Sequence, residues 1–173
     1  AGPDHDLSFL QAPGPSDAPP ADPDALDYAS FMEQIGAILM GRTTHDVVAG
    51  MGIDWPYGET PVLVATTRPL ADRPATVRGV KGDIRELLAE AREAAGDRDI
   101  YLDGGDLVRQ ALAEGMVDEL CLTILPVLLG RGVRLFDGLE RSTLLEFTGH
   151  SRSAGGMVQL TARPRRPDSA GSP

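Results

Sequence analysis

The sequence predicts an α/β domain with a mostly parallel sheet and a C-terminal antiparallel hairpin. Short apolar runs with strand character alternate with amphipathic helical segments, which is typical of parallel strands joined by crossover helices. Near the C-terminus, Leu144–His150 and Met157–Ala162 have strand character and are separated by the turn-forming Ser153–Gly156. The chain has 173 residues and 42% hydrophobic content, which suits one globular domain with a sizeable core.

Apolar and β-branched runs predict the strands that precede the hairpin. They are short and continuous, as expected of strands that are buried on both faces. In chain order these runs are Ala37–Met40, Pro61–Thr67, Thr76–Val80, Ile100–Leu102 and Asp118–Leu125, the last stopped by Pro126.

Caps and glycine stops define the predicted helices. Asp22 followed by Pro23 predicts a helix that ends near Gly36, because Asp caps the N–H groups and Pro suits the first helical position. A second helix follows Gly41, and Asp83 caps an amphipathic helix that Gly96 ends. The proline-rich residues 12–23 predict a loop, and residues 164–173 predict a disordered tail.

Gly104 and Gly105 join a predicted strand to a predicted helix that Gly115 ends. Without Cβ atoms, the bend lets an anion approach the N–H groups at the helix start, so it predicts a phosphate cradle. Tight strand–helix packing explains the same glycines equally well. Asp106 argues against a cradle, because its carboxylate can cap the helix and would repel a phosphate. We therefore expect its side chain to point away from any ligand.

Composition excludes several classes of function. The formal net charge of −10 disfavours nucleic acids and anionic membranes as partners. No apolar run reaches the length of a membrane span, and no signal peptide is visible, so we expect a soluble cytoplasmic protein. Its lone cysteine, Cys121, is expected in the core and fits a reducing compartment. The histidines and this cysteine lack metal-ligand spacing, so we predict no metal site.

Polar residues follow the predicted strands at their carboxyl ends, where parallel sheets bind ligands. Each set alone is compatible with a simple cap or a solvated arginine. Together, two arginines, several hydroxyls and a glycine cradle suit a dinucleotide with an extra phosphate. The G-x-G-x-x-G fingerprint of the standard dinucleotide fold is absent. The candidate cofactor-binding residues are Gly41, Arg42, Thr43, Thr44, Thr66, Thr67, Arg68, Gly104, Gly105, Asp106 and Leu107.

Three segments resemble the dihydrofolate reductase-like family. AILMGRTTHDVV resembles its strand–Gly-Arg-x-Thr–helix unit, and IYLDGGDLV resembles its glycine-paired strand–helix turn. VDELCLTILPVLLGRGVRLF resembles the bacterial group that includes the reductase domain of riboflavin biosynthesis. The resemblance runs from about Ala1 to Arg163 and implies a single three-layer dihydrofolate reductase-like domain over residues 1–163. It also implies that the family's first strand would lie before Ala1 and is missing here.

The resemblance implies an NADPH-dependent reductase that transfers a hydride to a small heterocyclic substrate of pterin, pyrimidine or related type. Arg42, with Thr66, Thr67 and Arg68, would hold the 2′-phosphate of NADPH. Thr43 and Thr44, with the turn at Gly104, Gly105 and Asp106, would hold its pyrophosphate. A non-catalytic module that binds a nucleotide or a flavin on the same fold is the alternative.

Further residues are candidates for contact with the substrate, the cofactor or a second subunit. The resemblance offers Asp27 or Asp24 as the carboxylate that helps to protonate substrate, and a solvated aspartate is the alternative for each. His45 is expected to face solvent beside the cofactor. Trp55 and Tyr57 could stack on a planar substrate or anchor their loop. The apolar segment Leu122–Leu129 suggests a homodimer, although a buried central strand explains it equally well.

Overall fold

The computed structural model describes residues 2, 20–23, 25–71 and 73–165, which fall into two compact units. One unit is residues 28–111, and the other combines residues 1–27 with residues 112–173. The elements in chain order are α1 (Tyr28–Gln34), β1 (Ile35–Gly41), α2 (Arg42–Ala49), β2 (Val62–Ala65), β3 (Val77–Val80), α3 (Ile84–Ala95), β4 (Asp99–Asp103), α4 (Gly105–Ala113), β5 (Leu120–Ile124), β6 (Leu145–Arg152), η3 (Ala154–Gly156) and β7 (Val158–Pro164).

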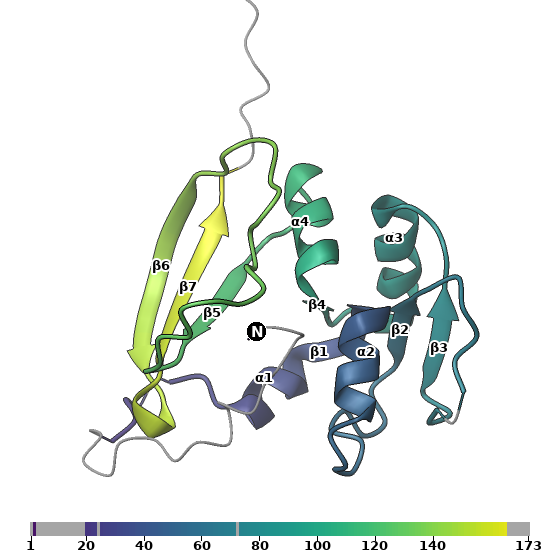
Figure 1. The fold of residues 1–173 in the computed structure, drawn as a ribbon, viewed down its shortest axis with the longest axis horizontal. Helices are drawn as coiled ribbons and strands as arrows, with labels where there is room; N and C mark the ends of the chain where they lie inside the picture. Colours follow the sequence, from purple (N-terminus) through teal and green to yellow (C-terminus); the bar gives the residue numbers. More distant parts are fainter. Residues whose placement is uncertain (1, 3–19, 24, 72, 166–173) are drawn as a thin grey trace, which may run out of the picture. The chain divides into compact units, whose positions relative to one another are not determined.

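A parallel four-stranded sheet with the order β3-β2-β1-β4 forms the centre of the 28–111 unit (Figure 1). β1 lies between β2 and β4, and its residues from Ile35 to Met40 are fully buried because helices cover both faces of the sheet. On one face, Ile38 and Met40 pack with side chains of α1 and α2. α3 packs on β1 and β4.

Helix α3 of this unit begins at a capping residue and ends at a glycine. The Asp83 carboxylate accepts from the Arg85 and Glu86 amides, and the Glu86 side chain returns a hydrogen bond to the Asp83 amide. This capping box fixes the start of α3. Gly96 follows its last turn with a φ of 63°, a left-handed value that favours glycine. The predicted cap and stop of this helix are confirmed.

Gly36 allows α3 to approach β1 closely. A Cβ atom at this position would lie 2.2 Å from the backbone oxygen of Ala95, the last residue of α3. We expect Gly36→Ala to reduce the free energy of unfolding by about 1–3 kcal/mol, because helix and strand must move apart. Urea unfolding measures this loss. Gly41→Ala is the matched control, since no atom lies within 4 Å of its added Cβ; an equal loss in both variants would contradict the packing argument.

The C-terminal strands form a separate antiparallel sheet with the order β5-β7-β6. β6 and β7 make the predicted hairpin, joined through the short helix η3, so the fold class is confirmed. The sequence did not indicate that β5 would pair with β7 rather than join the parallel sheet. Cys121 is exposed on β5, so its predicted core position is wrong. Strand alternation explains the error, because Leu120 beside it is the buried residue.

The helix predicted from Asp22 begins later, at Tyr28. The Asp22 carboxylate accepts hydrogen bonds from the Arg152 backbone and guanidinium instead of capping a helix. These bonds hold the pKa of Asp22 below its usual value, because they favour the charged form. Most of the predicted loop 12–23 and residues 166–173 of the predicted tail lie outside the described residues; Pro164 belongs to β7. Within the described stretches, no helix is long and apolar enough to cross a membrane.

Candidate functional site

A hollow lies at the carboxyl ends of the parallel strands, where α/β sheets bind ligands. It is formed by the ends of β2 and β3, the residues that follow β1, β2 and β3, and the first turns of α3 and α4. Its lining residues are Arg42, Ala65, Thr66, Thr67, Arg68, Val80, Lys81, Gly82, Leu87, Asp106, Leu107 and Gln110. The structure therefore brings together six of the eleven residues predicted to bind a cofactor.

The charge of the hollow is opposite to that of the whole chain. Arg42, Arg68 and Lys81 line it with a single carboxylate, Asp106, whereas the chain carries a formal net charge of −10. A local excess of cations in an acidic protein attracts an anion to this place in particular. The arrangement is suited to bind a phosphate group.

The guanidinium of Arg42 is held at two points. Its Nε donates to Oδ1 of Asp46 at 2.7 Å, and its Nη1 donates to the backbone oxygen of Pro69 at 3.1 Å. The side chain is 23% exposed. Two of the five guanidinium N–H donors are thus engaged by the protein, and the others remain for a ligand in the hollow.

A local turn shapes the loop after β2. The Thr66 hydroxyl accepts from the Arg68 amide at 3.1 Å, the geometry of a hydroxyl-stabilised turn. Since Arg42 also bonds to Pro69, both arginines are attached to this one loop. The Thr66 hydroxyl therefore stabilises the conformation of the loop that carries Arg68.

Gly104 allows the bend after β4 to contact the start of α2. Its φ is 99°, and a Cβ atom there would lie 2.8 Å from Oγ1 of Thr44 and 3.5 Å from the Gly41 nitrogen. The bend thus joins two of the predicted strand ends directly. The close packing that one explanation of the glycine pair requires is present. The phosphate cradle stays a prediction, and the helix of Gly105 starts beside the hollow.

The Asp106 carboxylate is bound by its own helix. It accepts from Gln110 at 2.8 Å and lies 3.5 Å from Arg109, and its side chain is 77% exposed. These partners lie one turn later in α4 and hold the carboxylate on the surface of its own helix. It nevertheless lines the hollow, where it would repel a phosphate placed close to it.

Other candidates lie outside this hollow. Thr43 is exposed on the first turn of α2 and does not line it. Asp27 is exposed and precedes α1, and it belongs to the other compact unit. Asp24 lies outside the described residues.

The expectation that His45 faces solvent is wrong. The residue is 6% exposed, its Nδ1 lies 3.1 Å from Oδ1 of Asp46, and its ring centroid lies 6.0 Å from that of Trp55. Trp55 packs edge-on against Tyr57, which is buried in the core beside β1 and β2. Of the two interpretations of Trp55 and Tyr57, this packing favours the loop anchor.

Asp103, the last residue of β4, is a carboxylate that the sequence reasoning missed. Strand pairing places it beside Met40 on the sheet face that α1 and α2 cover, next to Tyr101 and near Tyr28 and Tyr57. Burial raises the pKa of Asp103, and hydrogen bonds from the Gly104 amide and the Tyr101 hydroxyl oppose this only in part. A partly buried carboxyl with a raised pKa can hold and donate a proton. Its position directly before Gly104 was the available sequence signal.

The raised pKa of Asp103 predicts a pH dependence of stability. The folded protein holds this proton more tightly than the unfolded chain, so the protonated carboxyl adds to the free energy of unfolding. This stabilisation is fully present below the ordinary pKa of 3.8 and is lost as pH rises through the folded-state pKa. We therefore expect the free energy of unfolding of the wild type, relative to Asp103→Asn, to fall as pH rises from about 4 towards about 8. Urea unfolding of both proteins at several pH values measures this. A constant difference would contradict the raised pKa.

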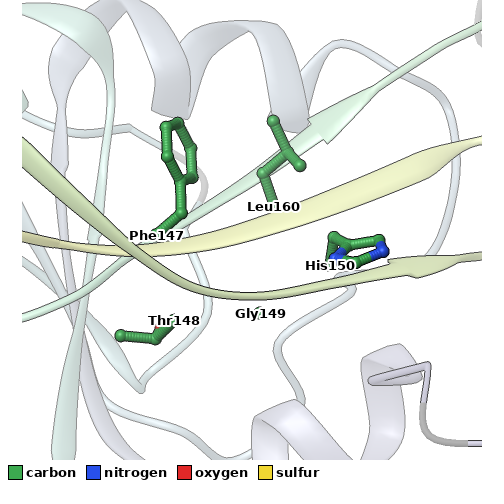
Figure 2. A pocket seen from close by; sticks show the side chains of 5 residues that line it. All are labelled: Phe147, Thr148, Gly149, His150 and Leu160. Atoms are coloured by element: carbon green, nitrogen blue, oxygen red, sulfur yellow. The ribbon is translucent and has the colours of Figure 1, made fainter.

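A second hollow lies on the antiparallel sheet (Figure 2). Its lining residues are Phe147, Thr148, Gly149, His150 and Leu160, from β6 and β7. Figure 2 shows Phe147 and Leu160 projecting from one side of the sheet and Thr148 from the other. This hollow has no lysine or arginine among its lining residues, so it offers no comparable phosphate site.

The fold and the hollow define an α/β protein with a cationic depression at the carboxyl ends of its parallel strands, and comparison with known proteins identifies its family. Residues 10–159 match the model of the RibD C-terminal domain, so the chain belongs to this family. The crystal structure of a proposed riboflavin biosynthesis protein from Shewanella sp. PV-4 is similar, with 30% identity, a TM-score of 0.78 and coverage of 96% of this chain and 92% of the other.

Two further relatives are similar over most of their length. A pyrimidine reductase-like protein from Corynebacterium diphtheriae has the same fold, with a TM-score of 0.60, 16% identity and coverage of 83% of each chain. The uncharacterised protein YwjB of Bacillus subtilis (strain 168) is 28% identical over 133 residues, which are 77% of this chain and 76% of YwjB.

Proposed function

We propose that this protein is an NADPH-dependent reductase that transfers a hydride to a small heterocyclic substrate of pyrimidine, pterin or related type. The observation that carries the proposal is the cationic hollow at the carboxyl ends of β1, β2 and β3. Membership of the RibD C-terminal domain family supports this class of reaction, and the pyrimidine reductase-like relative supports this class of substrate.

The residues present fit the phosphates of such a cofactor. Arg42, Arg68 and Lys81 offer positive charge for the 2′-phosphate of NADPH, and Thr67 adds a hydroxyl. Gly104 and Gly105 keep Cβ atoms away from the start of α4, as close approach of a pyrophosphate requires. NADPH, when bound, supplies the hydride, and the protein binds, orients and protects the reacting groups from water.

Reduction of a C=N or C=O bond also consumes a proton. Asp103 is our candidate for its source, because burial raises the pKa of its carboxyl and so retains the proton at higher pH. Its partner Tyr101 orients the carboxyl by hydrogen bonding. Asp27, the candidate from the family resemblance, is exposed and belongs to the other compact unit, so we prefer Asp103.

Oxidation of NADPH across a panel of dihydropterins, ribityl aminouracils and quinones tests the proposed activity. Turnover of one compound, followed at the absorbance of the reduced nicotinamide, is the expected result. Absence of turnover with retained NADPH binding would favour the alternative of a non-catalytic binding module. An absorbance spectrum of the purified protein separates the remaining alternative, because a bound flavin absorbs visible light.

We also propose a homodimer in the cytoplasm. The apolar segment after β5 supports association, since Val127, Leu128 and Leu129 are all exposed. Light scattering at two protein concentrations checks this, and a monomer at both would contradict it. The free Cys121 is consistent with a reducing compartment.

A further inference from the structure

Asp46 connects Arg42 to the core of the 28–111 unit. Its Oδ1 accepts from Arg42 Nε at 2.7 Å and lies 3.1 Å from Nδ1 of His45. His45 is buried and contacts Trp55, so the carboxylate has a fixed partner behind it. Burial tends to raise the pKa of Asp46, but the hydrogen bonds from Arg42 and His45 outweigh it, and the pKa lies below its usual value.

This contact differs from an ordinary ion pair on a helix surface. A pair four residues apart on an exposed helix contributes little and leaves the arginine mobile. Here Arg42 also donates to the Pro69 oxygen, 27 residues away in sequence. Asp46 on α2 and Pro69 on the loop after β2 thus fix opposite parts of the guanidinium. The group is held in one orientation at the hollow before any ligand binds.

Asp46 itself does not line the hollow, whereas Arg42 does. Its carboxylate has two opposing effects on a phosphate that binds Arg42. It positions the guanidinium, which reduces the entropy that binding must remove, and its negative charge weakens the attraction for a second anion. Asparagine separates these effects, because its side-chain oxygen can accept the same hydrogen bonds without the charge.

We propose that Asp46 is a positioning residue that sets the preference for a ligand with a 2′-phosphate by holding Arg42 towards the hollow. This inference rests on the proposed function, because it concerns the same cofactor site. Asp46 acts through Arg42 and needs no contact with the ligand.

The test compares the dissociation constants of NADPH and NADH for the wild type, Asp46→Ala and Asp46→Asn. We expect Asp46→Ala to weaken NADPH binding about five- to tenfold, the loss of one positioning hydrogen bond, with NADH unchanged. Asp46→Asn is expected to bind NADPH at least as tightly as the wild type. Glu90→Ala is the matched control, because it removes one carboxylate from the Arg78–Glu90 ion pair outside the hollow, and it should change neither constant.

An NMR measurement without cofactor distinguishes failure of the proposed function from failure of the role given to Asp46. The Arg42 Nε–H signal should exchange slowly with water in the wild type and in Asp46→Asn, and rapidly in Asp46→Ala. A wild type that binds NADPH and NADH equally would overturn the proposed function and, with it, the specificity role. A wild type that prefers NADPH, with the same preference and the same Nε–H exchange in Asp46→Ala, would overturn the role of Asp46 alone.

Discussion

Replacement of Arg42 by alanine is expected to weaken NADPH binding by about 1.5–3 kcal/mol, the range for hydrogen bonds to charged groups. Arg42 lines the hollow, and the protein leaves part of its guanidinium available for a phosphate. NADH lacks the 2′-phosphate, so its dissociation constant should barely change. Calorimetric titration of wild type and variant with both cofactors measures the difference.

The control for this variant is Arg92→Ala. Arg92 lies in the last turn of α3, bonds to the Arg98 backbone oxygen and does not line the hollow. The Arg92→Ala variant loses the same positive charge as Arg42→Ala, so it reports the effect of net charge on cofactor binding. Equal weakening of NADPH by Arg42→Ala and Arg92→Ala would exclude a direct role of Arg42.

We expect Asp103→Asn to lower kcat by at least about 100-fold, the lower limit for loss of a general acid. Asparagine keeps the shape and hydrogen-bonding capacity of the side chain but carries no transferable proton. The affinity for NADPH should be unchanged, because Asp103 does not line the cationic hollow. In the wild type, kcat should fall as pH rises through the raised pKa of Asp103, and this dependence should be absent from the variant.

Asp99→Asn is the control at the other end of β4, where the aspartate is exposed. It should retain the wild-type kcat and its pH dependence. If the Asp103→Asn enzyme turned over substrate at the wild-type rate, the proton would have to come from another group or from water. Asp103 would then affect only the stability of the fold.

Local patterns were sufficient to predict the fold class and most elements. The Asp83 cap and the Gly96 stop defined α3, because both signals act within one helical turn. The strand ends that carry Arg42 and Arg68 could be expected to meet, since parallel strands present their carboxyl ends at one edge of a sheet. The partners of Arg42 could not be predicted to the same degree, because Pro69 reaches it only through the tertiary fold.

The wrong predictions and the missed residues have the same physical origin, because tertiary contacts decided each of them. Asp22 resembled a helix cap, but Arg152, 130 residues later, provides a stronger charged partner. His45 follows polar residues in the sequence, yet contact with Trp55 buries it. Lys81 belongs to no motif, and Asp103 was given no role although it directly precedes Gly104. They became candidates only when strand order placed Lys81 at the hollow and Asp103 beside Tyr101.

The cationic hollow should discriminate a phosphorylated adenine dinucleotide from its unphosphorylated counterpart. Parallel titrations of the purified protein with NADPH and NADH at one salt concentration test it most directly. We expect NADPH to bind more tightly than NADH by at least about tenfold, which corresponds to about 1.4 kcal/mol. Equal affinities, or no binding of either cofactor, would contradict it.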